Sequence, residues 1–157
     1  MYLGSWGTWY LTEEMLAYFA EIKKQNTDAK FLILSPDKVD VDDYDFKKDV
    51  ITVCAPRHLV PLYISLAKAA VFFIKPSYSK KASSATKLGE ILAMNVPVIT
   101  NKGWGDIESE LISKCVFFGI NGIRLPKGDS GRDYAGQYLS LQNGIEAYHL
   151  VYQSILA

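Results

Sequence analysis

Short apolar runs that alternate with helical patterns are the feature that most restricts the fold of this chain. The runs are mostly apolar, which is typical of strands buried on both faces. They cover residues 2–4, 30–35, 50–55, 69–74, 96–100 and 115–119. Helical patterns separate them, at residues 12–24, 56–68, 86–94 and 106–112. Because strands that alternate with helices form βαβ units, we expect an α/β fold with a parallel sheet and helices on both faces.

A last, longer helix is expected over residues 133–156. Its apolar residues follow alternating steps of four and three. They are Tyr134, Tyr138, Leu141, Ile145, Tyr148, Tyr152 and Ile155. Such a stripe fits either packing against the chain's own domain or a dimer seam, and we expect packing against its own domain.

Composition limits the size and the partners of the protein. The chain has 157 residues, of which 49% are apolar and 22% charged, enough for one buried core, so we expect a single domain over residues 1–157. The net charge is +0, which gives no general attraction to nucleic acid. Residues 69–74 form an apolar run far too short to span a membrane, so we expect a cytoplasmic location, free or peripheral to a membrane. Cys54 and Cys115 lie in apolar runs and are expected to be buried thiols.

The loop at residues 75–87 connects a predicted buried strand to a predicted helix and has the chemistry of a phosphate site. A helix amino terminus offers unpaired backbone N–H groups and a partial positive charge. Ser83, Ser84 and Thr86 add hydroxyl donors, and Lys87 adds a positive charge. An ordinary capped helix that follows a basic loop is the alternative. The Gly-Lys-Ser/Thr signature of a P-loop is absent, so a P-loop NTPase is excluded.

Other candidate ligand groups follow predicted strands. Glu90, one turn into the same helix, can accept hydrogen bonds from ribose hydroxyls. The alternative is an ordinary solvent-facing glutamate. The turn 101–106 contains glycines that permit close approach to a ligand, and its aspartate can simply cap the next helix. Arg57 can meet a phosphate and His58 can flank a base, although a structural role is common for a lone histidine. The acidic loop 36–48 lacks calcium-loop spacing, so we expect no metal site.

A longer motif carries a family resemblance. Pro76-Ser77, Glu90, Asn95-Val-Pro-Val-Ile99 and Gly103-Trp-Gly105 occur in the order of the donor-binding signature of GT-B glycosyltransferases. The chain resembles family 4 of these enzymes, and its opening, Tyr2-Leu-Gly-Ser-Trp-Gly-Thr-Trp-Tyr10, is similar to the first strand and loop of the donor domain. The resemblance implies a Rossmann-like fold that is one half of a GT-B fold, with the N-terminal acceptor domain absent from this chain.

The resemblance also implies roles for individual residues. Glu90 would bind the ribose hydroxyls, the loop 83–86 with Lys87 would hold the diphosphate, and Arg57 and His58 would line the base. Gly4, Ser5 and Gly105 would lie close to the bound nucleotide sugar. Enzymes of this type transfer a sugar from an NDP-sugar to a glycan, usually with retention and without a metal, so a UDP- or GDP-sugar donor and a glycan acceptor are implied. We expect no other cofactor, and no activity from this chain alone.

Departures from the motif keep other functions open. Ala82 stands where the family has a second glutamate, and Ser5 and Tyr10 stand where it has an arginine and a lysine. These changes are compatible with a degenerate GT-B module that acts in protein interaction. A sugar-nucleotide epimerase-like domain is a further alternative, although the expected catalytic histidines and carboxylates are not evident.

Overall fold

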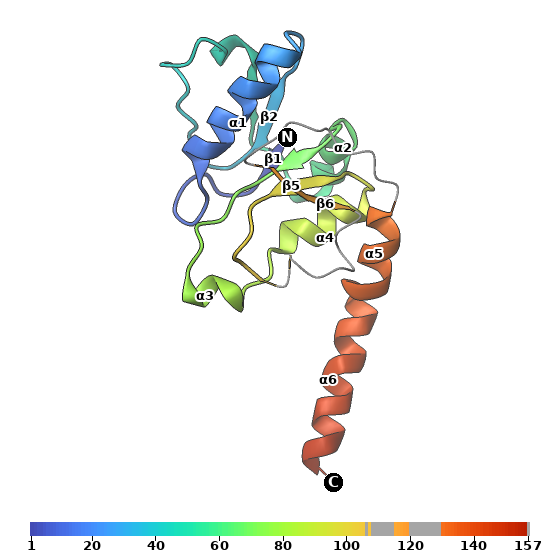
Figure 1. The fold of residues 1–157 in the computed structure, drawn as a ribbon. Coiled ribbons are helices and arrows are strands. Elements are labelled where there is room, and N and C mark those ends of the chain that lie inside the picture. The colour runs from blue at the N-terminus through green and yellow to red at the C-terminus, as the bar shows by residue number, and fades with distance from the viewer. Residues whose placement is uncertain (106, 108–114, 120–129, 157) are drawn as a thin grey trace.

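The computed structural model describes residues 1–105, 107, 115–119 and 130–156. It is an α/β structure with parallel strands (Figure 1). The strands are β1 (Tyr2–Leu3), β2 (Phe31–Leu34), β3 (Val50–Val53), β4 (Ala70–Val71), β5 (Val98–Thr100) and β6 (Val116–Phe118). The helices are α1 (Thr12–Gln25), α2 (Val60–Ser65), α3 (Tyr78–Lys81), α4 (Thr86–Ala93), α5 (Gly131–Tyr138) and α6 (Leu141–Leu156), with short 3-10 turns η1 (Lys47–Asp49) and η2 (Arg57–Leu59).

The strands form two three-stranded parallel sheets, β1-β2-β3 and β4-β5-β6. Met1 joins them, because its backbone nitrogen donates to the carbonyl of Ala69 (2.7 Å) and its carbonyl accepts from the N–H of Val71 (2.8 Å). This is the hydrogen-bond pattern of a parallel bridge. The combined strand order is therefore β3-β2-β1-β4-β5-β6, and the order reverses direction between β1 and β4.

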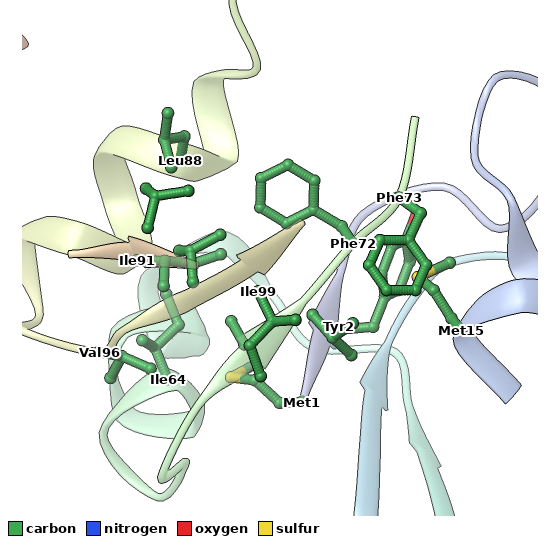
Figure 2. Packing of buried hydrophobic residues seen from close by; sticks show 14 of the residues in the cluster. Met1, Tyr2, Met15, Ile64, Phe72, Phe73, Leu88, Ile91, Val96 and Ile99 are labelled. Atoms are coloured by element: carbon green, nitrogen blue, oxygen red, sulfur yellow. The ribbon is translucent and has the colours of Figure 1, made fainter. Parts of the chain in front are cut away.

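Helices cover the strands from two sides. Figure 2 shows Met15 of α1 on one side of the strands, with Leu88 and Ile91 of α4 on the other. On the α1 side, Tyr18 meets Phe73 edge to face, with 5.8 Å between ring centroids. Right-handed crossovers explain this arrangement, because connections that run in opposite directions along a parallel sheet lie on opposite faces. The prediction of an α/β fold with parallel strands is confirmed.

The carboxyl-terminal region differs from the prediction. The single helix expected over residues 133–156 is two helices, which break at Leu139 and Ser140. Only α5 packs on the rest of the chain, where Gly131 and Ala135 are buried against α4. No residue of α6 is buried, and the helix projects away from the sheets (Figure 1). The expectation that the whole apolar stripe packs against its own domain is therefore wrong for α6.

Smaller differences concern single residues. Cys54 is exposed rather than buried, because β3 ends at Val53 and is an edge strand, whereas Cys115 is buried as expected. The helix α3 was not predicted, since its four residues are too short to show a period. The predicted helix over 106–112 falls almost entirely outside the described residues.

Candidate functional site

The carboxyl ends of β1 and β4 lie at the point where the strand order reverses. Ligands of open parallel sheets bind at such a point, because the loops that leave the two strands separate there. Here the loop after β1 crosses the extension of β4, with a backbone bond from Leu11 N–H to the Phe73 carbonyl (2.9 Å) and one from Lys75 N–H to the Trp9 carbonyl (2.8 Å). The amino end of α4 approaches the same place through Lys87, which contacts Tyr2 of β1.

Lys87 is the central side chain of this site. It is only 7% exposed, although lysine is almost never fully buried without a charged partner. Its ammonium nitrogen lies over the rings of Tyr10 (3.7 Å), Tyr2 (4.3 Å) and Phe72 (5.4 Å) and donates to the Tyr2 hydroxyl at 3.3 Å. Three aromatic faces stabilise a cation, yet they accept no strong hydrogen bonds from its three N–H groups. The site thus holds a buried amino group with spare donor capacity, which carries a positive charge when it is protonated.

The electrostatics of Lys87 reflect this burial. Burial lowers its pKa from 10.5 to about 7, and the nearby carboxylate of Glu90 opposes that shift without cancelling it. Burial also raises the pKa of the Tyr2 and Tyr10 hydroxyls, so both remain neutral acceptors and donors at neutral pH. An anion that reached the ammonium would restore the charged form, because an opposite charge within a few ångströms favours it.

Gly4 makes room for the lysine. It has a φ of +122°, and a Cβ built there would lie 2.7 Å from the Lys87 nitrogen. Any side chain at this position would therefore displace the ammonium. Ser5 follows directly, and its carbonyl accepts a hydrogen bond from the Tyr2 hydroxyl. The structure thus brings Gly4, Ser5 and Lys87 together.

Glu90 and Arg57 form a second part of the site. The Arg57 guanidinium, in η2 just after β3, donates to a carboxylate oxygen of Glu90 in α4. The Glu90 side chain is 27% exposed and the Arg57 side chain 82% exposed, so solvent weakens this pair. Lys87 and Glu90 are three residues apart on one helix and therefore lie on the same side of it. His58 lies beside Arg57 and is exposed.

Gly105 fixes the loop before α4. Its N–H donates to the Lys80 carbonyl (2.8 Å), and a Cβ built on it would lie 2.7 Å from the Ser83 carbonyl oxygen. Asn101, buried at the end of β5, binds both backbone groups of Ile74 through its side chain, at 2.7 and 2.8 Å. These contacts hold the loops after β4 and β5 together at the carboxyl edge.

The hydroxyl groups of the 83–86 loop lie in different surroundings. The Ser83 hydroxyl donates to the Ser79 carbonyl (3.2 Å), while Ser84 and Thr86 are exposed. Thr86 is the first residue of α4, whose preceding residue is Ala85, so no side chain caps this helix end. The amino end of α4 beside Lys87 therefore has no side-chain cap on its backbone N–H groups.

Sequence reasoning missed the aromatic surroundings of Lys87. Lys87 was given a role through its charge alone, and Tyr2 and Phe72 were placed only within predicted strands. The sequence did contain a signal for these surroundings. A strand and a loop that are expected to meet at the carboxyl ends of β1 and β4 both carry aromatic residues. The Arg57–Glu90 pair has no signal in the sequence, because the two residues are far apart in it.

No protein-family model, no curated protein and no solved structure matches this chain. Within the described ranges, no group of three or more His, Cys, Asp or Glu side chains is placed to hold a metal ion. No helix among the described residues combines the length and the apolar character needed to cross a membrane.

Proposed function

We propose that this chain binds a nucleoside diphosphate, carried as a nucleotide sugar, at the carboxyl ends of β1 and β4. In this proposal the chain is a Rossmann-like donor domain, one half of a GT-B glycosyltransferase, that transfers a sugar to a glycan acceptor. The observation that carries the proposal is the buried ammonium of Lys87 at the reversal point of the strand order. A buried cation with spare donors is costly unless it meets an anion, and a diphosphate supplies one.

The neighbouring groups support the same ligand. The amino end of α4 adds backbone N–H donors and a partial positive charge beside the ammonium. Glu90, in the next turn of the helix, would accept hydrogen bonds from ribose hydroxyls, and Arg57, which donates to Glu90, would line the base together with His58. Lys87 takes the role of the missing basic pair, since Ser5 and Tyr10 carry no positive charge.

Catalysis in this proposal depends on stabilising the leaving diphosphate. Negative charge develops on the phosphate oxygens as the glycosidic bond to the donor breaks. A fixed ammonium in a low-dielectric site stabilises that charge more than water does. The step needs no metal, because Lys87 and the helix amino end supply the positive charge.

A second candidate function is a non-catalytic interaction module. The observation that favours it is α6, which exposes Leu141, Ile145, Tyr148, Tyr152 and Ile155. An exposed apolar surface of this kind typically marks a protein contact. The two functions are separable, since α6 is not part of the Lys87 site.

Calorimetric titration of the chain with UDP, GDP, ADP and CMP, with and without EDTA, tests the proposal. We expect one nucleoside diphosphate to bind and EDTA to have no effect. Lys87→Met should weaken binding about 10- to 100-fold, the range for losing a charged hydrogen-bond partner. Glu90→Gln should reduce the preference for the ribonucleotide over its 2′-deoxy form. Lys24→Met, on the exposed end of α1, is the matched control and should bind as the unmodified chain does.

The proposal fails if the unmodified chain binds none of the four nucleotides at millimolar concentration. It also fails if Lys87→Met binds the diphosphate with unchanged affinity while remaining folded by circular dichroism. Binding that requires a divalent ion would contradict the metal-independent mechanism.

A further inference from the structure

The carboxyl edge of the sheets carries loops of opposite charge. Residues 75–105, which include the loops after β4 and β5, contain five lysines and one carboxylate, that of Glu90. Residues 36–48, in the loop after β2, contain five aspartates and three lysines. Because parallel strands all end at the same edge, the two groups of charges share this edge. The net charge of +0 therefore hides a basic side and an acidic side.

Backbone bonds bring the lysines of the basic side onto one surface. The N–H of Lys75 donates to the carbonyl of Trp9 (2.8 Å), and the N–H of Gly105 donates to the carbonyl of Lys80 (2.8 Å). The loop after β4 therefore lies between the loops after β1 and β5. We call the lysine side chains of these loops the basic rim, and they are Lys75, Lys80, Lys81 and Lys102. Lys80 is half-buried and the other three are exposed.

Two exposed aromatic side chains lie among these lysines. Trp9 is 53% exposed, and the Lys80 ammonium lies 4.4 Å from the centroid of its ring. Tyr78, in α3, is 93% exposed, and α3 stands away from the sheets (Figure 1). Aromatic residues are enriched at recognition sites, because a large rigid ring gives contact area at a low cost in conformational entropy. The basic rim with Trp9 and Tyr78 is therefore a candidate recognition surface for an anionic ligand.

This surface borders the proposed nucleotide site. Trp9 precedes Tyr10, whose ring lies 3.7 Å from the Lys87 ammonium. Only residues 82–85 separate α3 from α4, the helix that carries Lys87. In a group transfer the second substrate must lie against the first, so that the reacting atoms meet. The basic rim is thus next to the place where an acceptor would meet the donor.

The acidic side restricts which anion fits. The N–H of Trp6, in the loop after β1, donates to the Asp37 carboxylate (2.7 Å), so the acidic loop begins beside the β1 loop. A nucleic acid strand or an anionic membrane extends its negative charge across the whole edge and would meet the aspartates of residues 36–48. A glycan segment of a few sugar rings covers the basic rim alone. Its rings also offer C–H groups that pack on the face of an indole.

We propose that the acceptor is an anionic glycan, whose uronic acid rings bind the basic rim and Trp9. This inference rests on the proposed function, because it names the acceptor of the same transferase. The carboxylates of the glycan pair with the ammonium groups of the rim, and one sugar ring packs on the Trp9 indole. The acidic loop repels the rest of the glycan and so limits the bound segment to the basic side, next to the Lys87 site.

Calorimetric titration of the chain with tetragalacturonate at low salt tests this inference. We expect saturable binding that weakens as the salt concentration rises, because the rim is exposed. The methyl ester of the same tetrasaccharide keeps the rings and lacks the charges, whereas tetraglutamate keeps the charges and lacks the rings. Both should bind at least about tenfold more weakly. In NMR spectra of the unmodified chain, the signal of the Trp9 indole N–H should shift when the tetrasaccharide binds.

Variants of the chain make the test specific. Trp9→Ala should weaken glycan binding about tenfold without changing the charge of the rim. The double variant Lys75→Gln with Lys81→Gln should weaken it about three- to tenfold, because each exposed ion pair contributes little. Lys68→Gln is the matched control, since Lys68 is an exposed lysine that precedes β4 at the opposite edge, and it should bind the glycan as the unmodified chain does. Circular dichroism shows whether each variant is folded.

Nucleotide titrations of the same variants separate this inference from the proposed function. Trp9→Ala and the double variant should bind the nucleoside diphosphate as the unmodified chain does, and saturating nucleotide should leave the glycan affinity unchanged. Nucleotide binding without glycan binding at millimolar concentration would overturn the anionic acceptor and leave the proposed function standing. Glycan binding without nucleotide binding would overturn the acceptor role of the rim.

Three further results would also contradict the inference. Equal binding of tetraglutamate would make the rim a general anion surface, and tighter binding of a DNA tetranucleotide would make it a nucleic-acid surface. Competition between nucleotide and glycan would place the glycan at Lys87 instead. Unchanged glycan affinity in both Trp9→Ala and the double variant would place the glycan elsewhere on the chain.

Discussion

Replacing Lys87 by Met tests the central physical statement about the site, that a buried ammonium is held there at a cost. Methionine keeps an unbranched stem and removes the charge. In the unfolded chain the lysine has a pKa near 10.5, whereas burial lowers it to about 7 in the folded chain. Between these pH values the unfolded state binds more protons than the folded state, so Lys87 makes stability rise with pH.

The size of the effect follows from the same two values. Between pH 7 and pH 9 Lys87 should raise the free energy of unfolding by about 2 kcal/mol. This is an upper value, because the faces of Tyr2 and Tyr10 favour the ammonium by ~0.5–2 kcal/mol each. The Met1 amine, whose pKa burial lowers to about 5, and the Cys115 thiol, whose pKa burial raises, also titrate differently on folding. Both groups are present in the variant and in the unmodified chain, so their contributions cancel in the difference in stability.

Urea unfolding at pH 6, 7, 8 and 9, followed by circular dichroism, provides the measurement. We expect the difference in stability between Lys87→Met and the unmodified chain to be largest at pH 6, in favour of the variant, and to shrink as the pH rises. Parallel stability curves across this range would refute the reasoning, since they would mean that Lys87 keeps its ordinary pKa. A stability advantage of the variant that is larger at pH 9 than at pH 6 would mean that folding raises the pKa of Lys87 instead of lowering it.

Two further predictions concern the loops and the last helix. Gly105→Ala should lower the free energy of unfolding by about 1–3 kcal/mol, because its Cβ would lie 2.7 Å from the Ser83 carbonyl at a φ of +51°. Gly136→Ala is the matched control, because Gly136 lies on the exposed face of α5 and a Cβ built on it would contact nothing within 4 Å. This substitution should raise the free energy of unfolding by about 0.5–1 kcal/mol in the same urea titration. Removal of residues 141–156 should leave the melting temperature within about 2 °C, because no residue of α6 is buried. A large fall in the melting temperature would mean that α6 packs on the sheets in solution.

The success of the prediction from sequence differs from one part of the chain to another. The strands at residues 30–35, 50–55 and 96–100 were predicted within a few residues, because each is a compact apolar run between turn residues. The helical character of residues 133–156 was predicted too, on both sides of Leu139, but the break at Leu139 was not. Nothing in the 4-3 stripe marks that break, since the apolar period continues through it.

The site shows the same division. Strand–helix alternation places Gly4, Arg57 and Lys87 after strands or at a helix start, so the sequence by itself determined that they gather at one edge of the sheet. Burial could not be determined in that way, because it depends on which distant segments meet. Only the tertiary structure decided that Lys87 turns inward onto Tyr2, Tyr10 and Phe72, and that Arg57 pairs with Glu90. Local order follows from the period of side chains along the chain, whereas the charge state of one ammonium follows from packing between residues more than eighty positions apart.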